Sequence, residues 1–295
     1  LPSALSAPQA ISANAPALAL PALFVSHGAP LFAVDAGETG PALGRWGQDL
    51  KAQFPGLRGV VIMSPHWMAR SPLVMAGPQP ATWHDFGGFP PALYQLQYPA
   101  PGSPALAAEV VALLSAAGMP AQGDAARPFD HGAWVPLMHL YPNADVPVFQ
   151  VSLPVWLDAD GAYQYGRALA PLADEGVLIV GSGSLTHNLY EFRLGDPRAE
   201  AYAAEFAHWV RDAVLAGDHE RLRRALAIAP HARRAHPTAE HYLPLLVAAG
   251  AAAQGVPASV IEGGIVHGVL SMDSFVFGAA LAAGEDAAAN IVLPN

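Results

Sequence analysis

The stretch ALFVSHGAP at residues 22–30 decides the fold. Its first five residues form a short apolar run of the kind that makes a buried strand, and Gly28 and Pro30 then force a tight exit. His27 stands directly at the end of the run, and the glycine after it lets the backbone approach a ligand closely. The pattern predicts a strand that delivers a histidine to the edge of a sheet.

Three further histidines have comparable positions. His66 and His187 each follow an apolar run, and His241 lies in the segment HPTAEHY at residues 236–242. In an open α/β sheet ligands bind outside the carboxyl ends of parallel strands, so these side chains are expected to converge there. Imidazole is the commonest metal ligand among side chains and titrates nearest neutral pH. One such histidine is more often structural, but several at equivalent positions predict a metal site.

Short apolar runs bounded by Gly or Pro alternate along the chain with helical patterns. The expected strands are residues 22–26, 59–64, 147–152, 176–181 and 258–262. The expected helices are residues 104–117, 197–216 and 238–249, with Thr238 as N-cap of the last. This alternation predicts an α/β fold: a single domain with a mostly parallel central sheet flanked by helices, and a metal site at the carboxyl ends of the strands.

The composition of the chain limits which macromolecules, membranes and metal ligands are expected. The chain has 14 basic and 24 acidic residues and a formal charge of −10, which argues against nucleic acid, because that partner normally needs a basic face. Cysteine is absent, so a metal site must use His, Asp and Glu. No run of about 18–20 residues is apolar enough to span a membrane, and no membrane partner is expected.

Residues 1–20 differ in composition from the rest of the chain. They are rich in Ala, Pro and Ser and carry no charge, and we expect them to form a flexible extension. They lack the basic region of a secretory signal, which favours a cytoplasmic protein. Residues 21–295 are expected to form one folded, ligand-binding domain.

The segment at residues 77–104 is rich in Pro, Gly and aromatic residues and has no helical or strand periodicity. A long irregular loop in a compact domain is usually functional, so we expect this loop to frame a pocket. We select His84 and Phe86 within it as residues that contact a ligand. Trp67 and Trp134, in other motifs, are expected to add aromatic walls.

Two carboxylates and a serine accompany the histidines. Asp85 is expected to cap a turn, and Asp130 to orient a neighbouring imidazole. Ser184 follows Gly183, but the pattern Gly-x-Ser-x-Gly is not satisfied, so a serine hydrolase is weakly supported. His187 is either a further metal ligand or an acid–base residue.

Several motifs together are similar to those of a known family. They are FVSHGAP at 24–30, SPHW at 64–67, HDFGGFP at 84–90, YPAPG at 98–102, FDHG at 129–132, THNL at 186–189, PTAEHYLP at 237–244 and GVLSM at 268–272. In this order they resemble the class III extradiol ring-cleavage dioxygenases, the LigB-like superfamily, in its DOPA 4,5-dioxygenase branch. The resemblance covers nearly everything after residue 20, which makes residues 21–295 the expected catalytic domain.

The resemblance implies a mononuclear non-haem Fe(II) site that binds a small catechol and O2 and cleaves the ring beside the diol. His27, His66 and His241 would hold the metal, and His187 would be the acid–base residue, with His131 as a second donor toward oxygen. Zinc outranks ferrous iron in affinity for such ligands and is expected to occupy the same site. The branch also suggests a catechol with a polar side chain, such as DOPA.

Some points stay open at this level. The third ligand is either Glu240 or His241, and His187 is a possible fourth ligand. Three ligands and a water also describe catalytic zinc, so a zinc hydrolase is an alternative, as is a non-catalytic ligand-binding member of the same superfamily. Aromatic residues near the histidines favour a flat apolar substrate. The sequence does not define the oligomeric state.

Overall fold

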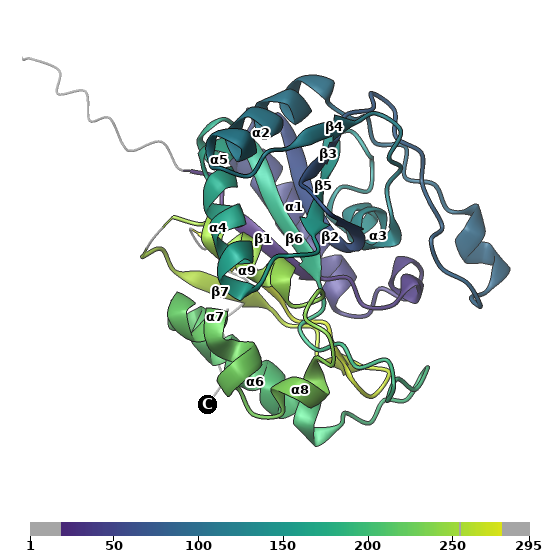
Figure 1. The fold of residues 1–295 in the computed structure, drawn as a ribbon. Helices are drawn as coiled ribbons and strands as arrows, with labels where there is room; N and C mark the ends of the chain where they lie inside the picture. Colours follow the sequence, from purple (N-terminus) through teal and green to yellow (C-terminus); the bar gives the residue numbers. More distant parts are fainter. Residues whose placement is uncertain (1–18, 254, 279–295) are drawn as a thin grey trace, which may run out of the picture.

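The centre of the fold is an eight-stranded sheet with the strand order β4-β3-β5-β2-β6-β1-β10-β7. The computed structural model describes residues 19–253 and 255–278, drawn in Figure 1. The strands of this sheet are β1 (Ala22–Ser26), β2 (Gly59–Ala69), β3 (Leu73–Met75), β4 (Gln122–Asp124), β5 (Val148–Pro154), β6 (Val177–Gly183), β7 (Ala258–Ile261) and β10 (Ser274–Phe277). A separate hairpin pairs β8 (Ile265–Val266) with β9 (Leu270–Ser271).

The middle of the sheet is parallel. β2 pairs in parallel with β5 and β6, and β6 pairs in parallel with β1. β3 and β10 add antiparallel pairs on either side of this middle. The expected α/β fold with a mostly parallel sheet is therefore confirmed, and the carboxyl ends of β1, β2 and β6 lie next to one another.

Helices cover both faces of the sheet. On one face α9 (Leu243–Ala251) packs on β1 and β6, and α4 (Ala159–Leu169) packs on α9, with α2 (Pro104–Ala116) beyond (Figure 1). On the other face α1 (Thr39–Gln53) packs against α3 (His131–Leu140), which contacts β2 and β6. The remaining helical elements are α5 (Pro171–Asp174), α6 (Ala201–Leu215), α7 (His219–Ile228), α8 (Ala232–Ala235), η1 (Pro30–Ala33) and η2 (Pro91–Gln95).

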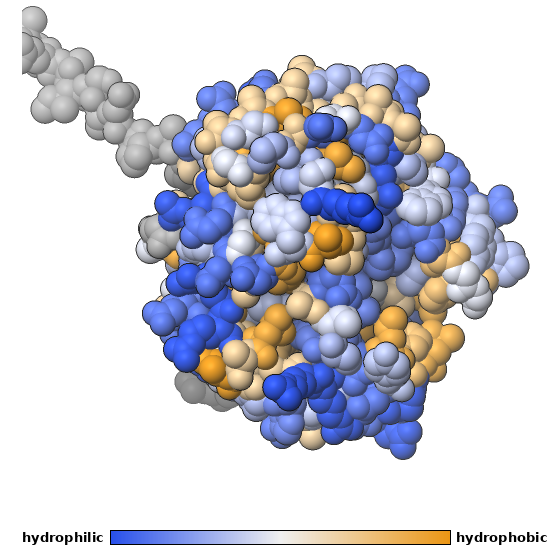
Figure 2. All heavy atoms as spheres, viewed as in Figure 1, coloured by the Kyte–Doolittle hydropathy of each residue, from blue (hydrophilic) through white to orange (hydrophobic). Residues whose placement is uncertain are grey.

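The apolar residues of the strands form the middle of the core, and the helices and connecting segments supply the larger share of it. β1, β5 and β6 are buried along their whole length, as expected for strands covered by helices on both faces. On the surface shown in Figure 2, hydrophobic residues form separate small patches among hydrophilic ones. Among the described residues, far more large hydrophobic side chains are buried than exposed.

The predicted strands are confirmed, with one change that affects a histidine. β2 does not end at Ser64 but continues to Ala69, and its register with β5 is irregular between Met63 and Met68. His66 therefore lies inside a strand rather than after one. A bulge re-aims side chains and is common beside active sites, and this irregularity turns His66 toward the carboxyl edge.

Two predicted helix starts were wrong. The helix expected from Thr238 begins at Leu243, because Pro244 is tolerated only in the first turn, where its ring meets no preceding carbonyl. The Thr238 hydroxyl donates to Glu240 instead of capping a helix. The helix expected from Pro197 begins at Ala201, since the Glu200 N–H is bonded to the Gly268 carbonyl.

The predicted extension at residues 1–20 lies outside the described residues except for its last two. Of these, Leu20 is buried in the core, so the described domain starts before the predicted boundary at residue 21. At the other end, residues 279–295 of the predicted domain are outside the described range.

β6 contributes a close backbone contact that places the segment before α9. The Ser184 N–H donates to the His241 carbonyl at 3.0 Å, and a Cβ on Gly183 would collide with that same carbonyl oxygen. Only glycine lets this segment lie directly on the strand, so the position of His241 depends on a residue without a side chain at 183.

We predict that Gly183→Ala lowers the free energy of unfolding by about 1–3 kcal/mol, because the added methyl overpacks a filled space. Urea unfolding measures the change. Gly56→Ala is the matched control: nothing lies within 4 Å of its added Cβ, and its effect should stay within about 0.5 kcal/mol. Equal effects of the two substitutions would contradict the packing argument.

Candidate metal centre

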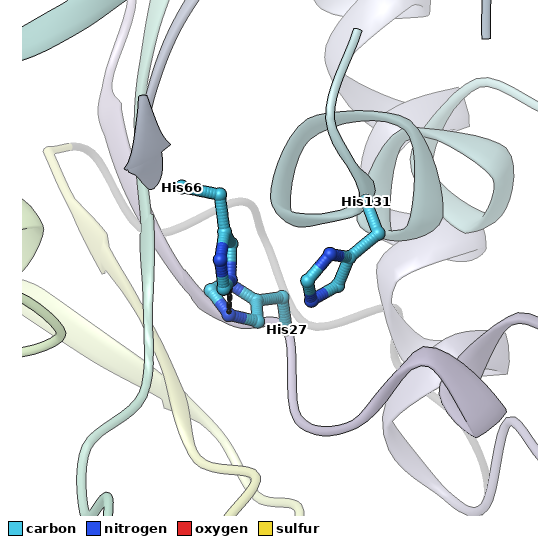
Figure 3. Close-up of side chains that lie close together, drawn as sticks. All are labelled: His27, His66 and His131. Carbon is cyan, nitrogen blue, oxygen red and sulfur yellow. Dashed lines mark hydrogen bonds between the residues drawn. The ribbon is translucent and has the colours of Figure 1, made fainter. Parts of the chain in front are cut away.

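Five histidines line one cavity of about 300 Å³. His27 follows β1, His66 lies in β2, His131 opens α3, His187 follows β6 and His241 precedes α9. The convergence expected for His27, His66, His187 and His241 is confirmed, since all four line the same cavity. His131 joins them from the start of α3, and in Figure 3 it faces His27 and His66 from the side opposite the strand that carries His66.

The imidazoles are close enough to share an ion. The Nε2 atoms of His27 and His66 are 3.3 Å apart, and the rings of His187 and His241 stack with centroids 3.5 Å apart. Ligand atoms lie within 4.8 Å of one another in two groups, which are His27, His66 and His131, and His187, Glu240 and His241. The five histidines of these two groups all line the cavity, whereas Glu240 does not.

A serine fixes the tautomer of His27. The Ser182 hydroxyl donates its single hydrogen to the Gly132 carbonyl, so toward His27 Nδ1, 2.9 Å away, it can only accept. His27 must then carry its proton on Nδ1, and Nε2 keeps a lone pair, which in the metal-free protein accepts from His66 Nε2–H at 3.3 Å. An outer hydrogen bond of this kind is how metal-binding histidines are normally oriented.

A carboxylate does the same for His241. Its Nδ1 lies 3.1 Å from Glu240 Oε1, and because an ionised carboxylate only accepts, Nδ1 carries the proton. The Nε2 atom of His241 is buried and has no hydrogen-bond partner among the described residues. A buried polar atom without a partner is costly, and an electron-pair acceptor such as a metal ion would satisfy it.

Asp85 orients His131, a role that the sequence did not indicate. Its Oδ1 accepts from both the backbone N–H of His131 at 2.8 Å and the ring Nδ1 at 2.9 Å. Asp85 thus caps the first turn of α3 and leaves His131 Nε2 with a lone pair. Asp130 was expected to orient an imidazole, which was wrong: its Oδ2 accepts from Arg127 and Gln150.

Burial keeps the imidazoles uncharged. It lowers the pKa of His27 and of His241 well below the usual value, with neighbouring histidines adding to the effect. Burial also lowers the pKa of His66, and that of His187 to about 4. Burial alone would raise the pKa of Asp85, but its hydrogen bonds from His131 hold it below the usual value. Neutral rings beside an ionised Asp85 suit metal binding and proton acceptance near pH 7.

These residues fit a metal ion. The ring centroids of His27, His66 and His241 are 5.1, 5.4 and 5.2 Å apart. Three imidazoles on one ion, with metal–nitrogen distances of about 2.0–2.1 Å, have centroids about 5 Å apart. An all-nitrogen donor set suits zinc and ferrous iron alike, so the geometry supports a metal without selecting the element.

Some of the aromatic residues near the histidines line the cavity and form its wall, and others pack behind that wall. Phe86 and Phe89 line the cavity, together with Phe192 from the loop after β6. Trp134 is buried and donates its Nε1–H to the Trp83 carbonyl. Of the residues predicted to contact a ligand, Phe86 is therefore in the wall, whereas Trp134 lies outside it.

The other two predicted contacts also lie outside the wall. His84 sits between Phe86 and Trp134 and donates to the Leu96 carbonyl. The buried Trp67 ring stacks under the Arg127 guanidinium at 4.7 Å. The sequence analysis did not select Phe89 or Phe192, which also line the cavity. Phe89 lies in the same HDFGGFP motif as Phe86 and could have been selected with it, whereas no sequence motif identifies Phe192.

Ser184 is not available as a nucleophile. Its side chain is fully buried, and its hydroxyl donates to the Thr186 carbonyl at 2.7 Å. A serine hydrolase is therefore not supported. In the part of the chain that the structure describes, no helix is long and apolar enough to cross a membrane.

Fold and site define an α/β protein with a candidate metal site, whose histidines meet at the carboxyl edge of the sheet. The family model described as the catalytic LigB subunit of aromatic ring-opening dioxygenase matches residues 21–277, so the chain belongs to this family of ring-opening dioxygenases, as its motifs predicted. It is an oxidoreductase of the extradiol class, in the DOPA 4,5-dioxygenase branch.

Named relatives cover most of the chain. It is 40% identical to 4,5-DOPA dioxygenase extradiol of Beta vulgaris over 86% of this chain and 95% of that protein. It is 39% identical to the Escherichia coli (strain K12) protein of the same name over 88% and 95%. The crystal structure of uncharacterized protein JW3007 from Escherichia coli K12 has a TM-score of 0.71 and 33% identity, covering 88% of this chain and 100% of that one.

We predict two classes of histidine tautomer in the metal-free protein. His27, His131 and His241 should carry the proton on Nδ1, because Ser182, Asp85 and Glu240 only accept there. The controls are His139, His84 and His236, which donate from Nε2 to backbone carbonyls. Long-range ¹⁵N–¹H NMR distinguishes the two.

The variant Asp85→Leu should alter the tautomer of His131 and leave His27 and His241 unchanged. A spectrum in which His131 carries its proton on Nε2 in the unaltered protein would contradict the assigned role of Asp85.

Proposed function

We propose that the protein uses Fe(II) to open the aromatic ring of a small catechol with O2, and that DOPA, the substrate in the names of its relatives, is among the catechols it accepts. The observation that carries the proposal is the set of inward, proton-free Nε2 atoms of His27 and His241 beside His66, walled by phenylalanine rings. Such a cavity binds a metal and a flat apolar ring together.

We assign His27, His66 and His241 as the metal ligands. Glu240 is the less suitable third ligand, because its Oε1 already accepts from the Thr238 hydroxyl and from His241 Nδ1. The Glu240 carboxylate instead accepts the hydrogen bond from His241 Nδ1 and so makes Nε2 of the same ring a stronger metal ligand. His187, stacked on His241, stays close enough to be a fourth ligand when no substrate is bound.

A bound ferrous ion would acidify a catechol hydroxyl and exchange electrons with O2, whereas zinc, with its filled d shell, cannot change oxidation state. The overall reaction balances without another reductant. One ring C–C bond beside the diol breaks, both oxygen atoms of O2 enter the product, and the ring supplies the electrons that reduce O2.

Proton movement is the work of the two remaining histidines. His187 is neutral near pH 7 because burial lowers its pKa to about 4, so its ring has a lone pair that accepts a proton from the diol and readily gives it up again. His131 presents a free Nε2 lone pair, and Asp85 stabilises the positive charge that forms when Nε2 accepts a proton. General acid–base catalysis of this kind contributes roughly 10²–10⁴-fold in rate.

The apolar wall orients the ring and excludes water. Phe86 and Phe89 stand on one side of the cavity, and Leu189, Phe192 and Leu270 complete it. A zinc hydrolase is less well supported, since hydrolysis needs polar groups around the substrate and the described wall beyond the histidines has none. The cytoplasmic location drawn from residues 1–20 stays a prediction.

The function is tested by loading the metal-free protein with Fe(II) under anaerobic conditions and then adding DOPA and air. One O2 should be consumed per catechol, with a visible absorbance from the ring-opened product, and monophenols should be left intact because one oxygen cannot chelate the metal. Zinc-loaded protein is the control and should be inactive. Iron-replete protein that leaves a broad panel of catechols unchanged would favour the non-catalytic binding protein.

Metal content tests the ligand assignment. His27→Ala and His66→Ala should abolish stoichiometric metal binding while circular dichroism stays unchanged, because each removes one of three donors. His241→Ala should reduce metal content more than Glu240→Ala. Full occupancy in either of the first two variants, or the reverse order for the second pair, would overturn the assignment.

The proposed role of His187 predicts a separation of turnover from metal binding. His187→Gln should retain iron and lose at least about a hundredfold in kcat, as expected when a general acid–base group is removed. Near-normal turnover would contradict the role, and parallel loss of iron would make His187 a ligand.

A further inference from the structure

We propose that the cavity selects catechols whose ring substituent is uncharged and apolar over catechols that carry a carboxylate or an amino-acid group. The inference rests on the proposed function and concerns its substrate class. It implies that DOPA is accepted but is not the preferred substrate.

The wall of the cavity offers no charged partner to a substituent. Apart from the five histidines, the lining residues are Gly28, Ala29, Pro30, Phe86, Phe89, Leu189, Phe192 and Leu270. No Asp, Glu, Lys or Arg side chain is among them in the residues that the structure describes. A carboxylate or ammonium group taken into such a wall loses its water without gaining a partner, which is strongly unfavourable.

The carboxylates nearest the histidines already have partners. Asp85 accepts from His131, and Glu240 accepts from His241 and the Thr238 hydroxyl. Both lie behind a histidine relative to the cavity, so neither faces an ammonium group on the substrate.

The charged groups of the loop after β6 are also paired. Glu191 binds Arg234 through both carboxylate oxygens, at 2.8 and 2.7 Å. Arg193 donates to Asp196 and to Glu200. A substrate carboxylate would therefore have to break an ion pair to gain a cation. The formal charge of −10 adds long-range repulsion against an anionic substituent.

The apolar wall continues to the surface. Leu189 lines the cavity and yet is 61% exposed, and its neighbour Tyr190 is 92% exposed. Leu189 therefore belongs to both the cavity and its mouth, and its inner side extends the apolar wall against which a ring substituent would be buried. Each methylene of an apolar substituent buried there gains about fourfold in affinity.

A matched pair of substrates tests the preference. 4-Propylcatechol and hydrocaffeate have chains of the same length, and the second ends in a carboxylate. We expect the iron-loaded protein to show a kcat/KM for 4-propylcatechol at least about tenfold above those for hydrocaffeate and DOPA. Calorimetric titration of the zinc-loaded protein, which does not turn over, should give the same order of affinities.

A charge added at the mouth should change the preference. Leu189→Arg should raise the hydrocaffeate to 4-propylcatechol ratio of kcat/KM at least about tenfold, because the guanidinium pairs with the carboxylate. Leu194→Arg is the matched control: Leu194 is 64% exposed on the same loop but does not line the cavity, and its ratio should stay that of the unaltered protein.

The outcomes separate this inference from the proposed function. If the iron-loaded protein cleaves DOPA or hydrocaffeate as well as 4-propylcatechol, the inference is overturned and the function stands. If it cleaves no catechol, the function fails, and the calorimetric order alone decides whether the cavity prefers apolar substituents. A ratio that shifts equally in Leu189→Arg and Leu194→Arg would also overturn the inference.

Discussion

The structure depends on holding five imidazoles close together at one cavity, three of them buried and two partly buried. Histidines at such distances repel one another once protonated, and burial already lowers the pKa of His27, His66, His187 and His241. A neutral ring offers one donor and one acceptor, so each ring needs an outside partner to set its direction. Ser182, Glu240 and Asp85 accept hydrogen bonds from the Nδ1–H groups of His27, His241 and His131. The Nε2 lone pairs of these rings then face the cavity, which makes it able to bind a cation.

The sheet provides the rigid frame for this arrangement. β1, β2 and β6 are neighbours in the parallel middle of the sheet, so the residues at their carboxyl ends are fixed relative to one another. The irregular register in β2 aims His66, and the glycine at 183 lets the backbone of His241 rest on β6. The histidines are therefore held close together before a metal ion binds, so little conformational entropy of the chain is lost when it does.

Chemistry and selectivity divide between the two halves of the cavity. The histidine half carries the residues to which we assign metal binding and proton transfer, and their outer hydrogen-bond partners are all polar. The other half is apolar and supplies no charge, so it can hold a flat ring but cannot pair with an ionic substituent. Membership of the ring-opening family is shown by the family match over residues 21–277, and our inference about the choice among catechols rests on the apolar half.

The sequence by itself determined the α/β class and the main strands, and it singled out all five histidines of the cavity, four from their positions and His131 through the family resemblance. This was possible because strand periodicity is local and because strand ends in a parallel sheet share one edge. It missed α3, whose interior Pro136 is atypical of a helix, and it began α9 too early. Only the tertiary structure decided the partners of the rings, since Asp85 and His131 are 46 residues apart and His27 and Ser182 are 155 apart. Hydrogen bonds over such separations leave no periodic signal in the sequence, because they depend on how the packed elements lie in space.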